Sequence, residues 1–289
     1  MKRIVLFLAT NLLVMTTLYG VVTILGLQGA LSQRGLNLPG LLLISVIYGF
    51  GGALISLALS RTIAKWMMKI QLVTPQSNGA FGQLASEVHA LASKAGLKAM
   101  PEVGIYDSPE MNAFATGPSQ KRSLVAVSTA LLTQMPRDQV QAVLAHEISH
   151  IKNGDMVTMT LLQGVVNVFA IFLARIVAYF ASMFVDSKLS GIVYFLVSLV
   201  CQVLFTFLGS FITMAFSRHR EYRADAGAAD LVGKNGMIGA LQTLETNFKA
   251  LDAPNGLQTA KIADAPGFMK LLSSHPPLAE RIEALRNHS

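Results

Sequence analysis

Long apolar stretches alternate with polar stretches along this 289-residue chain. Crossing a hydrocarbon core of about 30 Å takes about 20 helical residues. Four stretches reach that length, and the pattern predicts a membrane helix in each of them: Ile4 to Leu27, Leu38 to Ser60, Val157 to Phe184 and Gly191 to Phe216. Because no clear cleavage site of small residues precedes Gln28, we interpret the first stretch as a retained anchor rather than a signal peptide.

A compact polar region is predicted between the second and third membrane helices. Phe81 to Ala95 has the periodicity of a helix with one apolar face. A second helix is predicted from Pro136 to Lys152, since proline suits a first helical turn and Asn153-Gly154 supplies a stop. Segments of strand length between the two helices predict a small sheet: Pro101 to Ser108, Asn112 to Thr116 and Leu124 to Ser128.

Composition agrees with a membrane protein, since 52% of the residues are hydrophobic and only 13% are charged. The single cysteine, Cys201, cannot form an internal disulfide, so the fold does not depend on oxidation. The formal charge of +7 comes from dispersed Lys and Arg without a basic block. We therefore expect no nucleic-acid partner, because anionic lipid headgroups of the bilayer explain the excess more simply.

The positive charges near the ends of the apolar stretches predict the orientation, because Lys and Arg resist translocation. The loops on one side offer only Arg34 and Lys188. The other side is richer in basic residues: Lys2, Arg3, Arg61, Lys65, Lys69, Arg218, Arg220 and Arg223. Both termini and the large polar segments are thus expected in the cytoplasm. The expected organisation is two membrane helices in 1–60, a cytoplasmic segment in 61–156, two further membrane helices in 157–216 and a cytoplasmic segment in 217–289.

The predicted helix from Pro136 to Lys152 contains the sequence His146-Glu147-Ile148-Ser149-His150, the H-E-x-x-H pattern of zinc peptidases. Residues four apart lie on one helical face, so both imidazoles can bind one zinc ion. Glu147 lies beside them, where it can take a proton from a water activated by the metal.

A catalytic zinc site needs a third protein ligand, and no further histidine follows His150 at a suitable spacing. The fourth apolar stretch continues into a polar helix with Glu221 and Asp225 on one face. Glu221 can bind the metal while Asp225 accepts the second N–H of a zinc-binding imidazole. On spacing alone, both can equally be surface carboxylates paired with Arg218 or Arg223.

The order of these motifs resembles the HtpX family of bacterial integral-membrane proteases, which is related to the CAAX prenyl proteases. The likeness covers nearly the whole chain, and the motifs that carry it are Met111 to Gly117, Val125 to Leu132, His146 to Asp155, Glu221 to Asp225 and His275-Pro276-Pro277. The resemblance implies an α-helical membrane protein with four transmembrane helices. It also implies a cytoplasmic α+β metalloprotease domain of the zincin-like, gluzincin type.

The resemblance also implies roles for individual residues. It makes His146, His150 and Glu221 the ligands of one Zn²⁺ per chain, Glu147 the general base and Asp225 the orienting carboxylate. Three more positions match functional sites of the family: Asn112 on an edge strand that binds extended peptide, and His275 and Arg281, which face the reacting carbonyl or support the site. From the residues alone, His275 can equally be a loop histidine before a helix.

The expected function is hydrolysis of peptide bonds in membrane proteins on the cytoplasmic side of the bacterial inner membrane. The resemblance implies quality control of misfolded or damaged membrane proteins under stress, alongside other quality-control proteases. Unfolded proteins are also expected substrates. Two alternatives remain open at this stage. One is a CAAX-type processing protease, and the other is a non-catalytic membrane scaffold stabilised by its zinc site.

Overall fold

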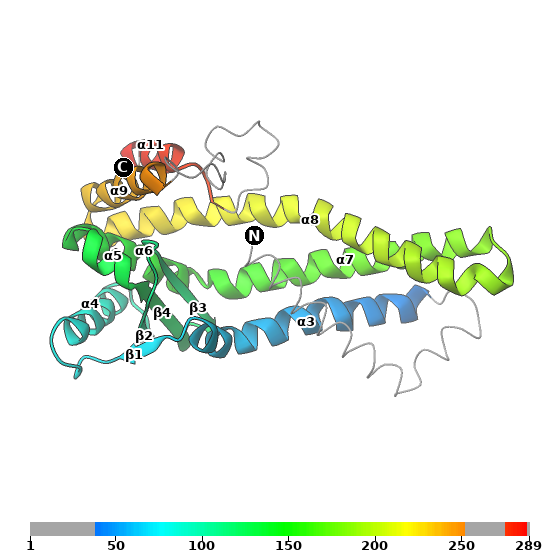
Figure 1. Cartoon of the computed structure of the whole chain (residues 1–289), viewed down its shortest axis with the longest axis horizontal. Helices are drawn as coiled ribbons and strands as arrows, with labels where there is room; N and C mark the ends of the chain where they lie inside the picture. The colour runs from blue at the N-terminus through cyan, green and yellow to red at the C-terminus, as the bar shows by residue number, and fades with distance from the viewer. Residues whose placement is uncertain (1–37, 252–274, 288–289) are drawn as a thin grey trace. The chain divides into compact units, whose positions relative to one another are not determined.

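The computed structural model describes residues 38–251 and 275–287 (Figure 1). The described residues form two compact units, one from 38–56 and 159–213 and the other from 57–158, 214–251 and 275–287. The first predicted membrane helix, Ile4 to Leu27, lies outside the described residues.

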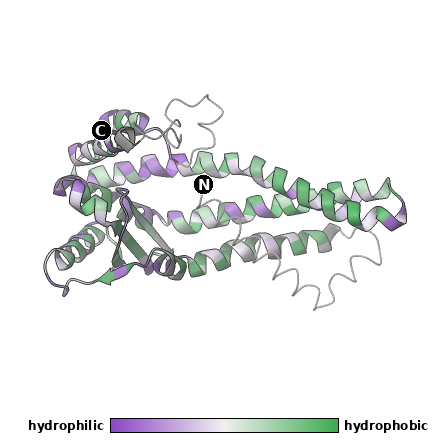
Figure 2. Ribbon diagram, in the orientation of Figure 1, coloured by the Kyte–Doolittle hydropathy of each residue, from purple (hydrophilic) through white to green (hydrophobic). Residues whose placement is uncertain are grey.

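Within the described residues, 3 helices are long and apolar enough to cross a membrane: α3 (Leu38–Met67), α7 (Asp155–Met183) and α8 (Ser187–Val232). α3 and α8 contain the second and fourth predicted spans, and α7 contains the third except for its last residue, Phe184. Figure 2 shows hydrophobic residues along most of α3 and α7, and a change from hydrophobic to hydrophilic residues along α8. α8 is one helix of 46 residues, so its apolar part continues without a break into the polar sequence that follows Phe216.

In the unit formed by residues 38–56 and 159–213, α3 and α7 approach each other closely at a small residue. A β-carbon added at Gly49 of α3 would lie 2.6 Å from Cγ2 and 2.7 Å from the backbone nitrogen of Val168 on α7. Beside this contact, Nδ2 of Asn167 donates to the Gly49 carbonyl at 3.5 Å, and Gln163 Nε2 donates to Oδ1 of Asn167 at 2.9 Å. Small residues and polar side chains are the usual means of joining helices in lipid, where no hydrophobic force acts between them.

The other unit, which begins at residue 57, contains a 4-stranded sheet in the order β1-β2-β4-β3. The three predicted strands are confirmed with shifted ends as β2 (Glu102–Tyr106), β3 (Ala113–Ser119) and β4 (Arg122–Ser128). A short strand that the sequence did not suggest, β1 (Gln71–Val73), pairs with β2. β2 and β4 are parallel, and β3 is antiparallel to β4. β3 is therefore an edge strand with one strand neighbour among the described residues.

Helices pack around this sheet and bury its apolar side chains. α4 (Ala80–Lys94) and α6 (Arg137–Asn153) confirm the two predicted helices within one residue at each end. α6 contacts β3, β4 and α4, and its other neighbours include α9 (Lys234–Leu251), which also contacts α11 (Leu278–Asn287). A short helix, α5 (Thr129–Gln134), follows β4. Gly154 ends α6 with φ 68°, a left-handed conformation that favours glycine.

Gly49→Ala is expected to destabilise the protein, because its β-carbon would overlap Val168 of the neighbouring helix. Overpacking of this kind costs about 1–3 kcal/mol. Thermal unfolding in detergent micelles measures the effect as a lower midpoint. Gly191→Ala is the matched control, since no described atom lies within 4 Å of the added carbon there. Equal midpoints for the two variants would contradict the close approach of α3 and α7.

Candidate metal centre

α6 presents two histidines on one face, as the four-residue spacing predicts. His146 and His150 are 6% and 8% exposed, and their rings meet edge to face with centroids 4.6 Å apart. Their Nε2 atoms are 3.1 Å apart. Two imidazole nitrogens therefore converge on one buried point beside α6.

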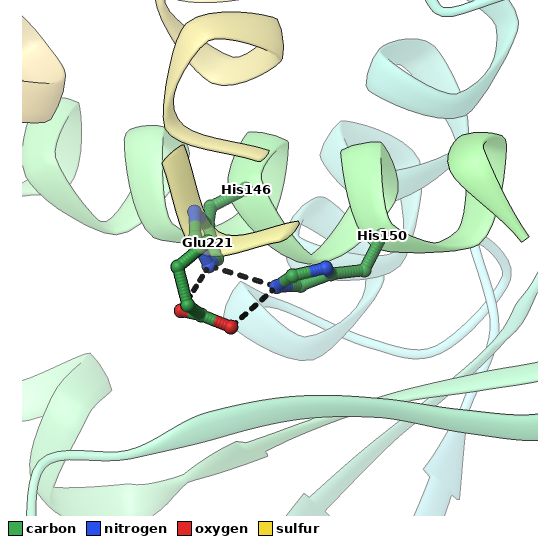
Figure 3. A group of neighbouring side chains, drawn as sticks. All are labelled: His146, His150 and Glu221. Atoms are coloured by element: carbon green, nitrogen blue, oxygen red, sulfur yellow. Dashed lines mark hydrogen bonds and ion pairs between the residues drawn. The ribbon is translucent and has the colours of Figure 1, made fainter. Parts of the chain in front are cut away.

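Glu221 of α8 supplies a carboxylate at the same point (Figure 3). Its Oε2 lies 3.5 Å from Nε2 of His146, and its Oε1 lies 3.4 Å from Nε2 of His150. The side chain is 1% exposed, yet neither carboxylate oxygen accepts a hydrogen bond from the described residues. Buried polar atoms without such partners are uncommon, and a metal ion is one explanation for them.

The donor set fits a zinc ion in both chemistry and spacing. Two imidazoles and a carboxylate are a known ligand set of catalytic zinc, with bond lengths of about 2.0–2.2 Å. Ligands at such distances in a tetrahedron are about 3.3–3.6 Å apart. The contacts from His146 and His150 to Glu221 are 3.5 and 3.4 Å, each to a different oxygen of the carboxylate, and the two imidazole nitrogens are slightly closer at 3.1 Å. A small separation of the rings would complete the match.

Asp225 lies one turn after Glu221 and faces the other side of the His146 ring. Its Oδ1 is 2.9 Å from Nδ1 of His146, although that ring nitrogen has no aligned hydrogen bond. Arg281 of α11 donates two hydrogen bonds to the Asp225 carboxylate, from Nε at 2.7 Å and from a terminal nitrogen at 2.6 Å. The structure thus joins Asp225 and Arg281, two residues that the sequence predicted for the site, in one buried ion pair.

The charges of this cluster shift the pKa values of its members. Burial lowers the pKa of His146, but contacts with Asp225 and Glu221 outweigh burial and raise the pKa to about 9. Burial raises the pKa of Asp225, and Arg281 and His146 more than reverse this, so its pKa lies below the usual range. Arg281 also loses solvation on burial, yet Asp225 and Glu221 raise its pKa. Each buried charge is therefore held by an opposite one.

His275 also reaches Glu221, with Nδ1 2.9 Å from Oε2 and a side chain that is 60% exposed. Burial raises the pKa of Glu221, but the contacts with His146, His150 and His275 lower it well below its usual range. Its carboxylate therefore carries a negative charge toward the point where the imidazoles converge. A solvent-exposed side chain beside a buried carboxylate places His275 at the open side of the site.

Glu147 and Asn112 are placed less directly. Glu147 is 9% exposed on α6, and its charge contributes to raising the pKa of Arg281. Asn112 directly precedes β3 and bonds to Ser128, accepting at its carbonyl at 2.9 Å and donating its N–H at 3.0 Å. The structure therefore puts Asn112 at the start of the edge strand rather than in the contact network of the metal-binding group.

Asp155 is a member of the site that the sequence analysis did not assign. Its Oδ2 lies 2.6 Å from Nδ1 of His150, and its side chain is fully buried. Arg223 contacts the other oxygen of Asp155 at 2.5 Å. The spacing His150-x-x-x-x-Asp155 across a glycine turn was the available signal.

A buried two-histidine, one-carboxylate centre on a chain with several membrane-length helices defines the class of membrane metalloproteases. The chain belongs to peptidase family M48, whose family model matches residues 78–289. This match includes both histidines of α6, Glu221 and the C-terminal helix α11.

Curated relatives extend the similarity over almost the full length. The chain is 49% identical over 293 residues to a protein named "Protease HtpX homolog" of Bacillus velezensis, with 98% of both chains covered. A "Protease HtpX homolog" of Pelodictyon phaeoclathratiforme is 51% identical over 293 residues, with 99% of both chains covered. The expected resemblance to the HtpX family is confirmed.

A solved structure supports the fold. The crystal structure of S. mikatae Ste24p matches with a TM-score of 0.66 at 22% identity, covering 98% of this chain. The match covers 66% of the Ste24p chain, so this chain corresponds to slightly less than two thirds of that protein. At this level of identity the match shows a shared fold alone.

Arg281→Met is expected to lower the free energy of unfolding of the metal-free protein by about 3–5 kcal/mol, because it leaves Asp225 buried without its guanidinium partner. Arg137→Met is the matched control. Arg137 is paired with Glu87 but its side chain is 72% exposed, and such pairs contribute under about 1 kcal/mol. Denaturant unfolding in micelles compares the two variants. Similar losses would contradict the buried ion pair.

Proposed function

We propose that the chain is a zinc-dependent endopeptidase in which His146, His150 and Glu221 hold one Zn²⁺ per chain. The observation that carries this proposal is the convergence of three ligand atoms within 4.8 Å of one another in a buried site. The oxygens of Glu221, which contact imidazoles but accept no aligned hydrogen bond, and the spacing of the three groups support zinc over an empty polar cluster. Membership in peptidase family M48 supports peptide bonds as the substrate.

Bound zinc would supply Lewis acidity, which polarises the scissile carbonyl and lowers the pKa of water. Glu147 follows His146 on α6, and we assign it the general base. It takes a proton from the attacking water and passes that proton to the leaving amine. Because water is the nucleophile, no covalent intermediate with the chain forms. Asp225 contacts Nδ1 of His146 and orients its ring, and Arg281 keeps Asp225 in place by hydrogen bonds.

His275 is assigned to the developing negative charge of the substrate carbonyl. Its side chain contacts Glu221 and is itself exposed to solvent, so a substrate can approach it. An imidazole N–H can donate a hydrogen bond to an oxyanion. This role is distinct from that of Arg281, whose side chain is 8% exposed and is engaged with Asp225.

β3 is proposed to bind the substrate in an extended conformation. It is an edge strand that contacts α6, and Pro118 within it fits an edge position, where a missing N–H is tolerated. An added substrate strand would receive backbone hydrogen bonds from β3. Asn112 at the start of β3 would contact one end of that strand.

Membrane proteins are the proposed substrates, with misfolded or damaged ones as the physiological targets, and unfolded proteins are included. Glu221 follows the apolar part of α8 on the same helix by about five residues, each rising about 1.5 Å. Cleavage close to the membrane surface follows. We place the protein in the bacterial inner membrane with its metal centre in the cytoplasm, in functional partnership with other quality-control proteases.

Glu147→Gln is expected to bind zinc at the same stoichiometry as the unaltered protein but to cleave a model membrane protein at less than about 1% of its rate, because the base is not a ligand. Glu221→Gln is expected to lose both zinc and cleavage. Glu87→Gln, a surface carboxylate paired with Arg137, is the control and should keep both.

Metal analysis after dialysis, beside the cleavage assay, separates the alternatives. A Glu147→Gln protein that still complements a deletion strain would support a zinc-stabilised scaffold. Cleavage confined to lipidated C-terminal peptides would support CAAX-type processing. Absence of zinc from the unaltered protein would overturn the proposed chemistry.

The proposed orientation predicts a labelling pattern. After replacement of Cys201 by alanine, a cysteine at Lys188 should react with an impermeant maleimide on intact inner-membrane spheroplasts, whereas one at Asn78 should not. Both positions are exposed, so accessibility within the protein is matched. Lysis should make Asn78→Cys reactive. The reverse pattern on intact spheroplasts would put the metal centre outside the cytoplasm.

A further inference from the structure

Asp155 makes a direct contact with a proposed zinc ligand. It is the first residue of α7, directly after the glycine that ends α6. Its side chain is fully buried, with Oδ2 2.6 Å from Nδ1 of His150. Since a carboxylate only accepts, Nδ1 of His150 donates this hydrogen bond. The lone pair of His150 is then on Nε2, the nitrogen that faces Glu221.

This hydrogen bond is better formed than the corresponding contact of the other histidine. His146 has Asp225 at 2.9 Å from Nδ1, but that nitrogen lacks an aligned hydrogen bond. His150 and Asp155, in contrast, meet at the distance and angle of a hydrogen bond. Of the two imidazoles, His150 is the one whose ring orientation is fixed by an aligned carboxylate.

Asp155 is itself held by an arginine. A terminal nitrogen of Arg223 donates to Oδ1 of Asp155 at 2.5 Å, while Oδ2 serves His150. Arg223 lies two residues after Glu221 on α8, so the contact joins the start of α7 to the helix that carries the third ligand. The chain His150–Asp155–Arg223 has the same order of groups as His146–Asp225–Arg281.

A simpler role for Asp155 is to start α7. A carboxylate in a first helical turn interacts favourably with the positive end of the helix. That role would affect the stability of the protein but not the orientation of the imidazole. It also needs neither full burial nor an aligned bond to His150, and Asp138 likewise lies in the first turn of α6 while exposed to solvent.

We infer that Asp155 is a positioning residue for zinc binding, which fixes the tautomer and ring orientation of His150 and is held in place by Arg223. The inference rests on the proposed zinc site. Partners of this kind raise metal affinity, and their loss typically weakens it about 10- to 100-fold.

Equilibrium zinc titration of the full chain in micelles against a competing chelator tests the inference. Asp155→Ala is expected to weaken zinc binding about 10- to 100-fold. Asp155→Asn should weaken it less, because the amide oxygen can still accept from His150. Asp138→Ala is the matched control, a first-turn aspartate away from the metal, and its zinc affinity should be unchanged. Unfolding midpoints of the metal-free variants are measured in parallel.

Zinc affinity of Asp155→Ala within about twofold of the unaltered protein, with only a lower unfolding midpoint, would overturn the inference in favour of the helix-starting role. If Asp155→Ala does not fold, Asp155→Asn and Arg223→Gln decide, and unaltered affinity in both would overturn it. Failure of the unaltered protein to bind zinc would instead refute the proposed function on which the inference rests.

Discussion

Two carboxylates, Glu221 and Asp225, are buried one turn apart on α8, each 1% exposed. Taking such groups out of water costs several kcal/mol each, so each needs an opposite charge or a metal beside it. Arg281 supplies the opposite charge for Asp225, while Glu221 contacts the two histidines of α6. Segments far apart in the sequence must therefore come together before either carboxylate can be buried, and this requirement ties the HExxH helix, α8 and α11 to one another.

The sequence was sufficient for features that local pattern determines. Apolar runs of membrane length predicted α3, α7 and α8, and helical spacing predicted that the pairs on α6 and α8 each share a face. Spacing alone left Glu221 and Asp225 open to an ordinary surface role. The structure excludes that reading, because both side chains are buried against histidines. Long-range convergence of this kind has no signature within either helix.

Other features depended on tertiary partners and were missed for that reason. β1 has only 3 residues, too few for a periodic pattern, and it exists because β2 offers it an edge. Asp155 ended the matching segment from His146 to Asp155, but the sequence analysis assigned no role to it. Its contact with His150 depends on the conformation of the chain at Gly154, the left-handed residue that separates α6 from α7.

Along the sequence, the histidine ligands of the proposed metal centre precede the apolar parts of α7 and α8, and the carboxylate ligand follows them. During synthesis, His146 and His150 leave the ribosome before the apolar parts of α7 and α8, whereas Glu221 emerges only after both, and Arg281 comes almost at the end of the chain. A nascent chain therefore lacks a complete ligand set until both helices have been made. On the proposed function, this order of the sequence delays hydrolytic activity until α7 and the apolar part of α8 have been synthesised.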